Sequence, residues 1–188
     1  FPKSEAASLE KLIYRQTVAP LLFLGCYAKP PRRKMTTIAS AAATTTTTGT
    51  STRQEEQGEG QDQQTYSNKD DEVLVGYVVS IQSADKNLTT ASMISHDPKG
   101  ASACIHSVCV ARDYQRRGIA TAMLKEYIKH LQRLNERICS EKDVPLERAL
   151  LITHQELISL YAGAGFKLVG ESSVVHGPDP WFEMVYQL

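Results

Sequence analysis

Three segments of the chain carry apolar residues at the three- and four-residue spacing of an amphipathic helix. This spacing predicts helices over residues 4–16, 118–134 and 155–162. The third is preceded by Thr153-x-x-Glu156, which has the form of an N-terminal capping box. The longest helix is predicted to bury one apolar stripe. That stripe consists of Ile119, Met123, Leu124, Tyr127, Ile128, Leu131 and Leu134.

Runs of β-branched and aromatic residues predict the strands. The run over residues 103–110 is apolar at both alternating sets of positions, which is typical of a central strand with helices on each face. Regular alternation along it places Cys104, His106, Val108 and Val110 on one face. Together these elements predict an α/β fold, a mixed sheet with helices on both faces. The strands are expected at residues 21–27, 73–81, 103–110, 149–153, 166–175 and 181–187.

Residues 32–71 interrupt this pattern with a low-complexity tract that contains five consecutive threonines and many Gln, Glu and Gly residues. Such a composition buries too little apolar surface to offset the entropy of ordering the chain. We therefore expect a disordered insert within a single domain that spans residues 1–188.

Charge and cysteine usage narrow the possible partners. The chain has 21 basic and 21 acidic residues, so no overall field favours nucleic acid or an anionic membrane. The four cysteines form no CxxC pair and no metal-ligand spacing with histidine, which predicts reduced thiols and no metal site. No run of about 20 apolar residues and no leader is found. These features predict a cytoplasmic protein without a membrane partner.

The central strand, a basic turn and the long helix follow one another directly. A helix N-terminus exposes unpaired N–H groups at the positive end of the helix dipole, and so it binds phosphate. Gly118 lets the backbone approach a ligand, and Arg116 and Arg117 add positive charge. A P-loop is excluded because Ile119 and Ala120 follow Gly118 in place of Lys and Ser or Thr. The turn is therefore a predicted polyphosphate site.

The pattern Gln115-x-x-Gly118-x-Ala120, after a strand that ends in Val-Cys-Val, resembles the coenzyme A loop of the GNAT superfamily of N-acetyltransferases. More narrowly, residues 1–27 and 72–188 resemble the arylalkylamine (serotonin) N-acetyltransferases, especially a fungal branch that includes polyamine acetyltransferases. The resemblance implies a GNAT-type, mostly antiparallel sheet whose first strand is missing before Phe1. It also implies that acetyl-CoA is bound by Val108, Cys109, Val110, Gln115, Arg116, Arg117, Gly118, Ile119 and Ala120.

Transfer of an acetyl group to an amine needs a route for the amine proton and a proton for the departing thiolate. The resemblance assigns the first role to His106, because it matches the second of two strand histidines; Cys104 replaces the first. It assigns the second role to Tyr161. Without the resemblance, His106 is a strand histidine bonded to a neighbour, Tyr161 is a core aromatic and Cys104 is a buried thiol. An acyl-cysteine mechanism through Cys104 is an alternative.

The acceptor is less well defined. Trp181 and Phe182, with Pro2 folded over them and Cys104 beside the base, are candidates for an aromatic slot that binds an arylalkylamine. Three carboxylates favour a polyamine instead. These are Glu156, Asp179 and Glu183.

We therefore expect a monomeric enzyme that acetylates a small primary amine by direct transfer, with an arylalkylamine ahead of a polyamine. Acetylation of a protein N-terminus or lysine is a rival activity. Two rivals from other classes are a non-catalytic acyl-CoA-binding module and an interaction protein that acts through residues 32–71.

Overall fold

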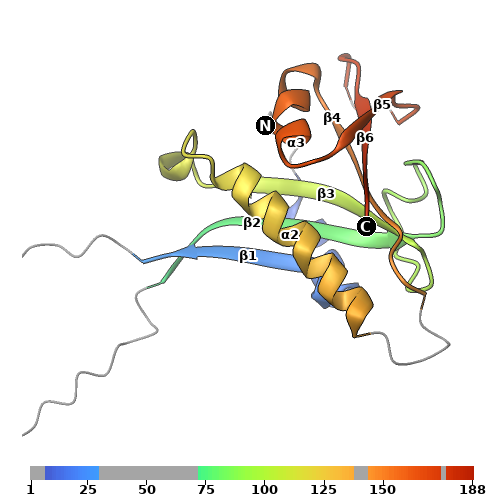
Figure 1. Cartoon of the computed structure of the whole chain (residues 1–188), viewed down its shortest axis with the longest axis horizontal. Helices are drawn as coiled ribbons and strands as arrows, with labels where there is room; N and C mark the ends of the chain where they lie inside the picture. The colour runs from blue at the N-terminus through green and yellow to red at the C-terminus, as the bar shows by residue number, and fades with distance from the viewer. Residues whose placement is uncertain (1–6, 30–71, 138–143, 175–176) are drawn as a thin grey trace, which may run out of the picture. The chain divides into compact units, whose positions relative to one another are not determined.

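The computed structural model describes residues 7–29, 72–137, 144–174 and 177–188, whose strands form one six-stranded sheet in the order β1-β2-β3-β4-β6-β5 (Figure 1). The strands are β1 (Phe23–Ala28), β2 (Val73–Ser83), β3 (Ser102–Val110), β4 (Arg148–Thr153), β5 (Lys167–Glu171) and β6 (Phe182–Gln187). The helices are α1 (Leu9–Val18), α2 (Ile119–Glu136) and α3 (Ile158–Gly163), with short 3-10 turns at η1 (Pro20–Leu22), η3 (Arg112–Tyr114) and η4 (Gln155–Leu157).

Four of the five strand pairs are antiparallel, and only β3 and β4 run parallel. The prediction of a mixed, mostly antiparallel sheet is therefore confirmed. The predicted insert at residues 32–71 lies outside the described residues, as do Pro2 and the first residues of the predicted N-terminal helix. Within the described ranges, no helix has the length and apolar character that a membrane crossing requires.

Helices lie on both faces of the sheet. Met123 of α2 lies against Gly76 of β2, whereas Arg15 of α1 lies beside Tyr77, the next residue of that strand. Successive side chains of a strand point to opposite faces, so α1 and α2 cover opposite sides. Figure 1 shows α2 crossing β1, β2 and β3.

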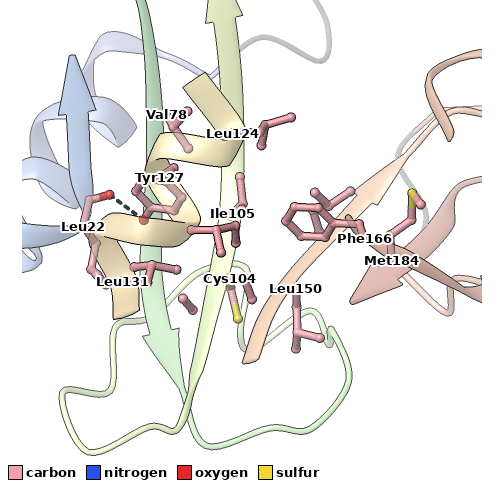
Figure 2. Packing of buried hydrophobic residues seen from close by; sticks show 14 of the residues in the cluster. Leu22, Val78, Cys104, Ile105, Leu124, Tyr127, Leu131, Leu150, Phe166 and Met184 are labelled. Carbon is pink, nitrogen blue, oxygen red and sulfur yellow. Dashed lines mark hydrogen bonds between the residues drawn. The ribbon is translucent and has the colours of Figure 1, made fainter. Parts of the chain in front are cut away.

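The predicted apolar stripe of α2 forms the centre of the core. Its middle residues are buried, and the phenol of Tyr127 donates to the Leu22 carbonyl at 3.0 Å (Figure 2). The same phenol bonds the Ser80 hydroxyl, so its polar atom is satisfied inside the core. The two ends of the stripe, Ile119 and Leu134, are partly buried against this cluster.

A β-bulge at His106 changes the predicted alternation of the central strand. Val79 pairs with Ser107 and Ser80 pairs with Ile105, so His106 has no opposite residue on β2. As a result, Val108 lies on the α2 side, on the face opposite Cys104. The prediction that Cys104 and Val108 share a face was therefore wrong, because one extra residue reverses the orientation of everything beyond it.

The predicted capping box also differs from the structure. His154 is the N-cap of η4, and no side chain caps either η4 or α3. Thr153 is the last residue of β4 and is buried, and its hydroxyl donates to the His154 carbonyl at 3.3 Å. The strand extends through the position that the box would have used.

Candidate active site

The site begins where β3 and β4 separate. The two strands pair only at Ser102–Cys104 with Arg148–Leu150, and Figure 1 shows them diverging beyond that point. A cavity of about 800 Å³ lies there, between the C-terminal half of β3, the start of α2 and the segment η4–α3. All the residues predicted to bind acetyl-CoA line it, except Arg117.

The turn before α2 is shaped by two left-handed residues. Arg116 has φ of 61° and Gly118, the N-cap of α2, has φ of 75°. Gln115 holds the turn against the strand, since its side-chain amide donates to the Val110 carbonyl at 3.0 Å. The first turn of α2 contains no acidic residue, so its positive end is not compensated locally. This arrangement presents backbone N–H groups to an anion in the cavity.

Glycine is favoured at position 118 by its conformation. A Cβ there would meet no atom within 4 Å, but the positive φ is unfavourable for every L-residue with a side chain. Arg117 does not line the cavity, and its guanidinium packs over the Tyr114 ring at 5.4 Å from the ring centre. Tyr114 itself lines the cavity, so Arg117 supports the wall from behind.

Tyr161 of α3 forms part of the cavity wall and is 6% exposed. Burial, and then the nearby Cys109 thiol, raise the pKa of Tyr161 to about 12, although a hydrogen bond with Thr153 opposes this shift. Its ring meets Phe166 edge-on at 6.2 Å. The phenol is therefore fixed in place and carries its proton at neutral pH, as a hydrogen-bond donor requires.

His106 lies just beyond the last paired residues of β3 and β4. Both of its ring nitrogens are buried and have no hydrogen-bond partner. Burial, together with the positive charges of Arg15 and Lys11, lowers the pKa of His106 to about 3. Since these charges belong to α1, we place the ring on the α1 side of the sheet. The imidazole is neutral at physiological pH.

Cys104 belongs to the core and does not line the cavity. Its side chain is fully buried, and burial raises the pKa of the thiol to about 12. A neutral buried thiol is not a nucleophile, so the structure favours the purely structural interpretation of this residue. Its predicted contact with the substrate stays a prediction.

Of the predicted aromatic slot the structure describes Trp181 and Phe182 but not Pro2, and neither of the two described side chains lines the cavity. Trp181 is 7% exposed and packs on the His154 ring with the ring centres 3.9 Å apart. Phe182 pairs with Thr153 in the β4–β6 ladder. Trp181 therefore supports the wall that His154 gives to the cavity.

Several site residues were not predicted. His154, Leu157 and Leu160 line the cavity because η4 and α3 follow β4 directly, but no motif in the sequence marks them. Arg15 was also missed, since a single arginine in a short amphipathic segment suggests a solvent-exposed position. In the described residues, no group of three His, Cys, Asp or Glu side chains is placed to bind a metal ion.

Comparison with known proteins identifies the fold family. Residues 34–150, more than half of the chain, match the family described as "Acetyltransferase (GNAT) family". The chain belongs to the GNAT family. The predicted coenzyme A turn therefore lies in a GNAT domain, and its strand, turn and helix occur in the predicted order.

Individual relatives of this GNAT domain are distant. Serotonin N-acetyltransferase of Mesocricetus auratus is 26% identical over 111 residues, which cover 59% of this chain and 49% of that enzyme. The chain thus spans about half the length of this relative. The NatC complex bound to Gag peptide and CoA is 18% identical, with a TM-score of 0.44 over 61% of this chain and 62% of that one. Arabidopsis thaliana NAA60 in complex with a bisubstrate analogue is 21% identical, with a TM-score of 0.44 over 64% of this chain and 69% of that one.

Proposed function

We propose that this GNAT domain transfers the acetyl group of acetyl-CoA directly to a small primary amine. The observation that carries the proposal is the cavity at the divergence of β3 and β4, which joins the basic turn before α2 to the buried phenol of Tyr161. The turn at Arg116–Ala120 would bind the pyrophosphate, and Val108–Val110 would bind the pantetheine arm.

In the reaction the amine nitrogen forms a bond to the thioester carbon, and the bond from that carbon to sulfur breaks. The thiolate leaves with the electron pair and gains a proton, while the amine loses one. The Tyr161 pKa of about 12 exceeds that of a thiol, about 8.5, by roughly 3.5 units. Complete transfer of the phenol proton to the thiolate thus costs about 5 kcal/mol. Tyr161 therefore acts mainly by donating a hydrogen bond to the developing thiolate.

The same comparison limits the role of His106. An alkylammonium has a pKa of about 10.4 and the imidazole has a pKa of about 3, a gap of roughly 7 units or about 10 kcal/mol. His106 therefore does not strip the proton from a free ammonium. It accepts a hydrogen bond from the amine after that proton has left to water, or from the far more acidic nitrogen of the tetrahedral intermediate.

The α1 side of the sheet supports an aromatic acceptor. Phe23 and Tyr77 stack there with ring centres 5.6 Å apart and an angle of 14° between the rings. Both side chains are only partly buried, and Arg15 acts on Tyr77 as well as on His106. We infer an arylalkylamine-type acceptor whose ring lies on this pair, in place of the slot predicted at Trp181. A polyamine is disfavoured because its second ammonium would meet the charges of Arg15 and Lys11.

A thiol-release assay tests the proposal. The chain is incubated with acetyl-CoA and each of tryptamine, spermidine and a peptide with a free N-terminus, and release of coenzyme A is followed. We expect turnover with the aromatic amine and little with spermidine. Binding of coenzyme A without turnover on any amine would support the acyl-CoA-binding module instead. Turnover on the peptide alone would support protein acetylation.

A further inference from the structure

Helix α1 packs against the sheet through an arginine. Arg15 is 8% exposed and is the one buried residue of this helix. Two of its apolar residues point outward instead, since Leu9 is 72% and Ile13 is 54% exposed. An amphipathic helix normally does the reverse. The position of Arg15 therefore needs a reason other than burial of apolar surface.

Arg15 has no carboxylate partner among the described residues. The ion pairs there join Glu126 to Lys129 and Arg133, and Glu147 to Arg148. Burial lowers the pKa of Arg15, which reflects the loss of water around the guanidinium. Glu183, a buried acid on β6, accepts the Leu88 backbone N–H at 3.0 Å instead. A buried cation without a counterion is costly, so the arrangement favours an external anion.

A second unsatisfied group lies on the same side of the sheet. The two ring nitrogens of His106 are buried and have no partner, and the charge of Arg15 reaches this ring. The stacked rings of Phe23 and Tyr77 lie on this face too, and the charge of Arg15 acts on the Tyr77 phenol. Within the described residues, a cation without a carboxylate partner, an imidazole without a hydrogen-bond partner and an aromatic pair thus lie on the α1 side of the sheet.

We propose that the acceptor amine carries a carboxylate, which Arg15 binds, while its aromatic ring lies on Phe23 and Tyr77 and its amine faces His106. The inference rests on the proposed acetyltransferase function. A guanidinium binds a carboxylate through two parallel hydrogen bonds, and Lys11, one turn earlier on α1, adds positive charge. The acceptor class is therefore an aromatic amino acid, and its decarboxylated amine is the poorer substrate.

Matched substrate pairs test this assignment. The ratio kcat/KM is measured for tryptophan against tryptamine and for phenylalanine against phenethylamine, in the wild type, Arg15→Gln and Arg15→Lys. We expect the wild type to prefer each acid. Arg15→Gln should lower the ratio of kcat/KM for each acid to kcat/KM for its amine roughly 30-fold or more. Arg15→Lys should give an intermediate loss of this preference, because lysine keeps the charge but cannot form the two parallel hydrogen bonds of a guanidinium.

The outcomes separate the two proposals. No turnover with any member of either pair would overturn the proposed function. Turnover with equal or higher kcat/KM for the decarboxylated amines would overturn the carboxylate site alone, and this is also the result expected if an acidic side chain of the chain already pairs with Arg15. An equal loss for acid and amine in Arg15→Gln would assign Arg15 to the reaction itself and overturn its role in specificity.

A measurement on the wild type keeps the proposal testable if the variants do not fold. Indole-3-propionate carries the ring and the carboxylate but no amine, and indole-3-propionamide is its uncharged counterpart. We expect the acid to compete with the acceptor and the amide to inhibit at least about 10-fold more weakly. Equal inhibition by the two compounds would overturn the proposal.

Discussion

Protonation of His106 should make the folded protein sensitive to acid. Its pKa is about 3 in the folded state and about 6.5 when the chain is unfolded. Between these values the unfolded chain binds a proton that the folded protein does not, so stability falls as the pH drops through this window. From about pH 7.5 to about pH 5.0 the free energy of unfolding falls by about 2 kcal/mol, because pH 5.0 lies about 1.5 pH units below the pKa of the unfolded chain.

The variant His106→Asn isolates this contribution. Urea unfolding of wild type and variant at several pH values gives two curves of unfolding free energy against pH. His96, whose pKa is lowered by burial, and Glu183, whose pKa is raised by burial, titrate in both proteins, so their effects cancel in the difference. The smaller asparagine leaves a void that lowers stability by a similar amount at every pH.

We expect the wild type to lose about 2 kcal/mol more than the variant between about pH 7.5 and pH 5.0. Arg15→Gln should reduce this loss, because it removes one of the charges that hold the pKa of His106 down. Parallel curves for wild type and His106→Asn would refute the reasoning. They would show that the imidazole titrates normally in the folded protein, so that it can serve as an ordinary base near neutral pH.

Three further predictions concern the reaction and the packing. If His106 is neutral throughout, kcat/KM for the acceptor should rise with pH up to the pKa of the amine itself, without a break near 6.5; a break that vanishes in His106→Asn would contradict this. Tyr161→Phe should lower kcat about 100-fold with little change in the KM for acetyl-CoA, and unchanged turnover would make this residue structural. Gly100→Ala should cost about 2 kcal/mol or more in urea unfolding, because its Cβ would lie 2.2 Å from the Ser83 carbonyl carbon. The matched control Gly163→Ala, which meets no atom within 4 Å at the end of α3, should be neutral or slightly stabilising, and equal losses in the two variants would contradict the packing argument.

Elements that depend on residues close together in the chain were predicted better than features that depend on strand pairing or on packing between distant segments. The stripe of α2 and the glycine turn before it depend on residues close together in the chain, and both occur as expected. The bulge at His106 depends on the pairing of β2 with β3, so alternation along one strand misses it. The periodicity of α1 marks apolar positions such as Ile13, but the side chain that faces the sheet is Arg15, which only the tertiary structure reveals.

The bulge at His106 explains how one strand can serve two substrates. Before it, Ser102–Cys104 pair with both β2 and β4; beyond it, Val108 faces the α2 side, where the cavity and the basic turn lie. A regular strand would have placed His106 and Val108 on one face, where the cofactor arm and the acceptor would compete for the same space. With the extra residue, the imidazole faces α1 while the cavity wall faces α2. Under the proposed function, acetyl-CoA and the amine therefore approach from opposite faces and meet where β3 leaves β4, so that the amine nitrogen can reach the thioester carbon without an acyl-enzyme.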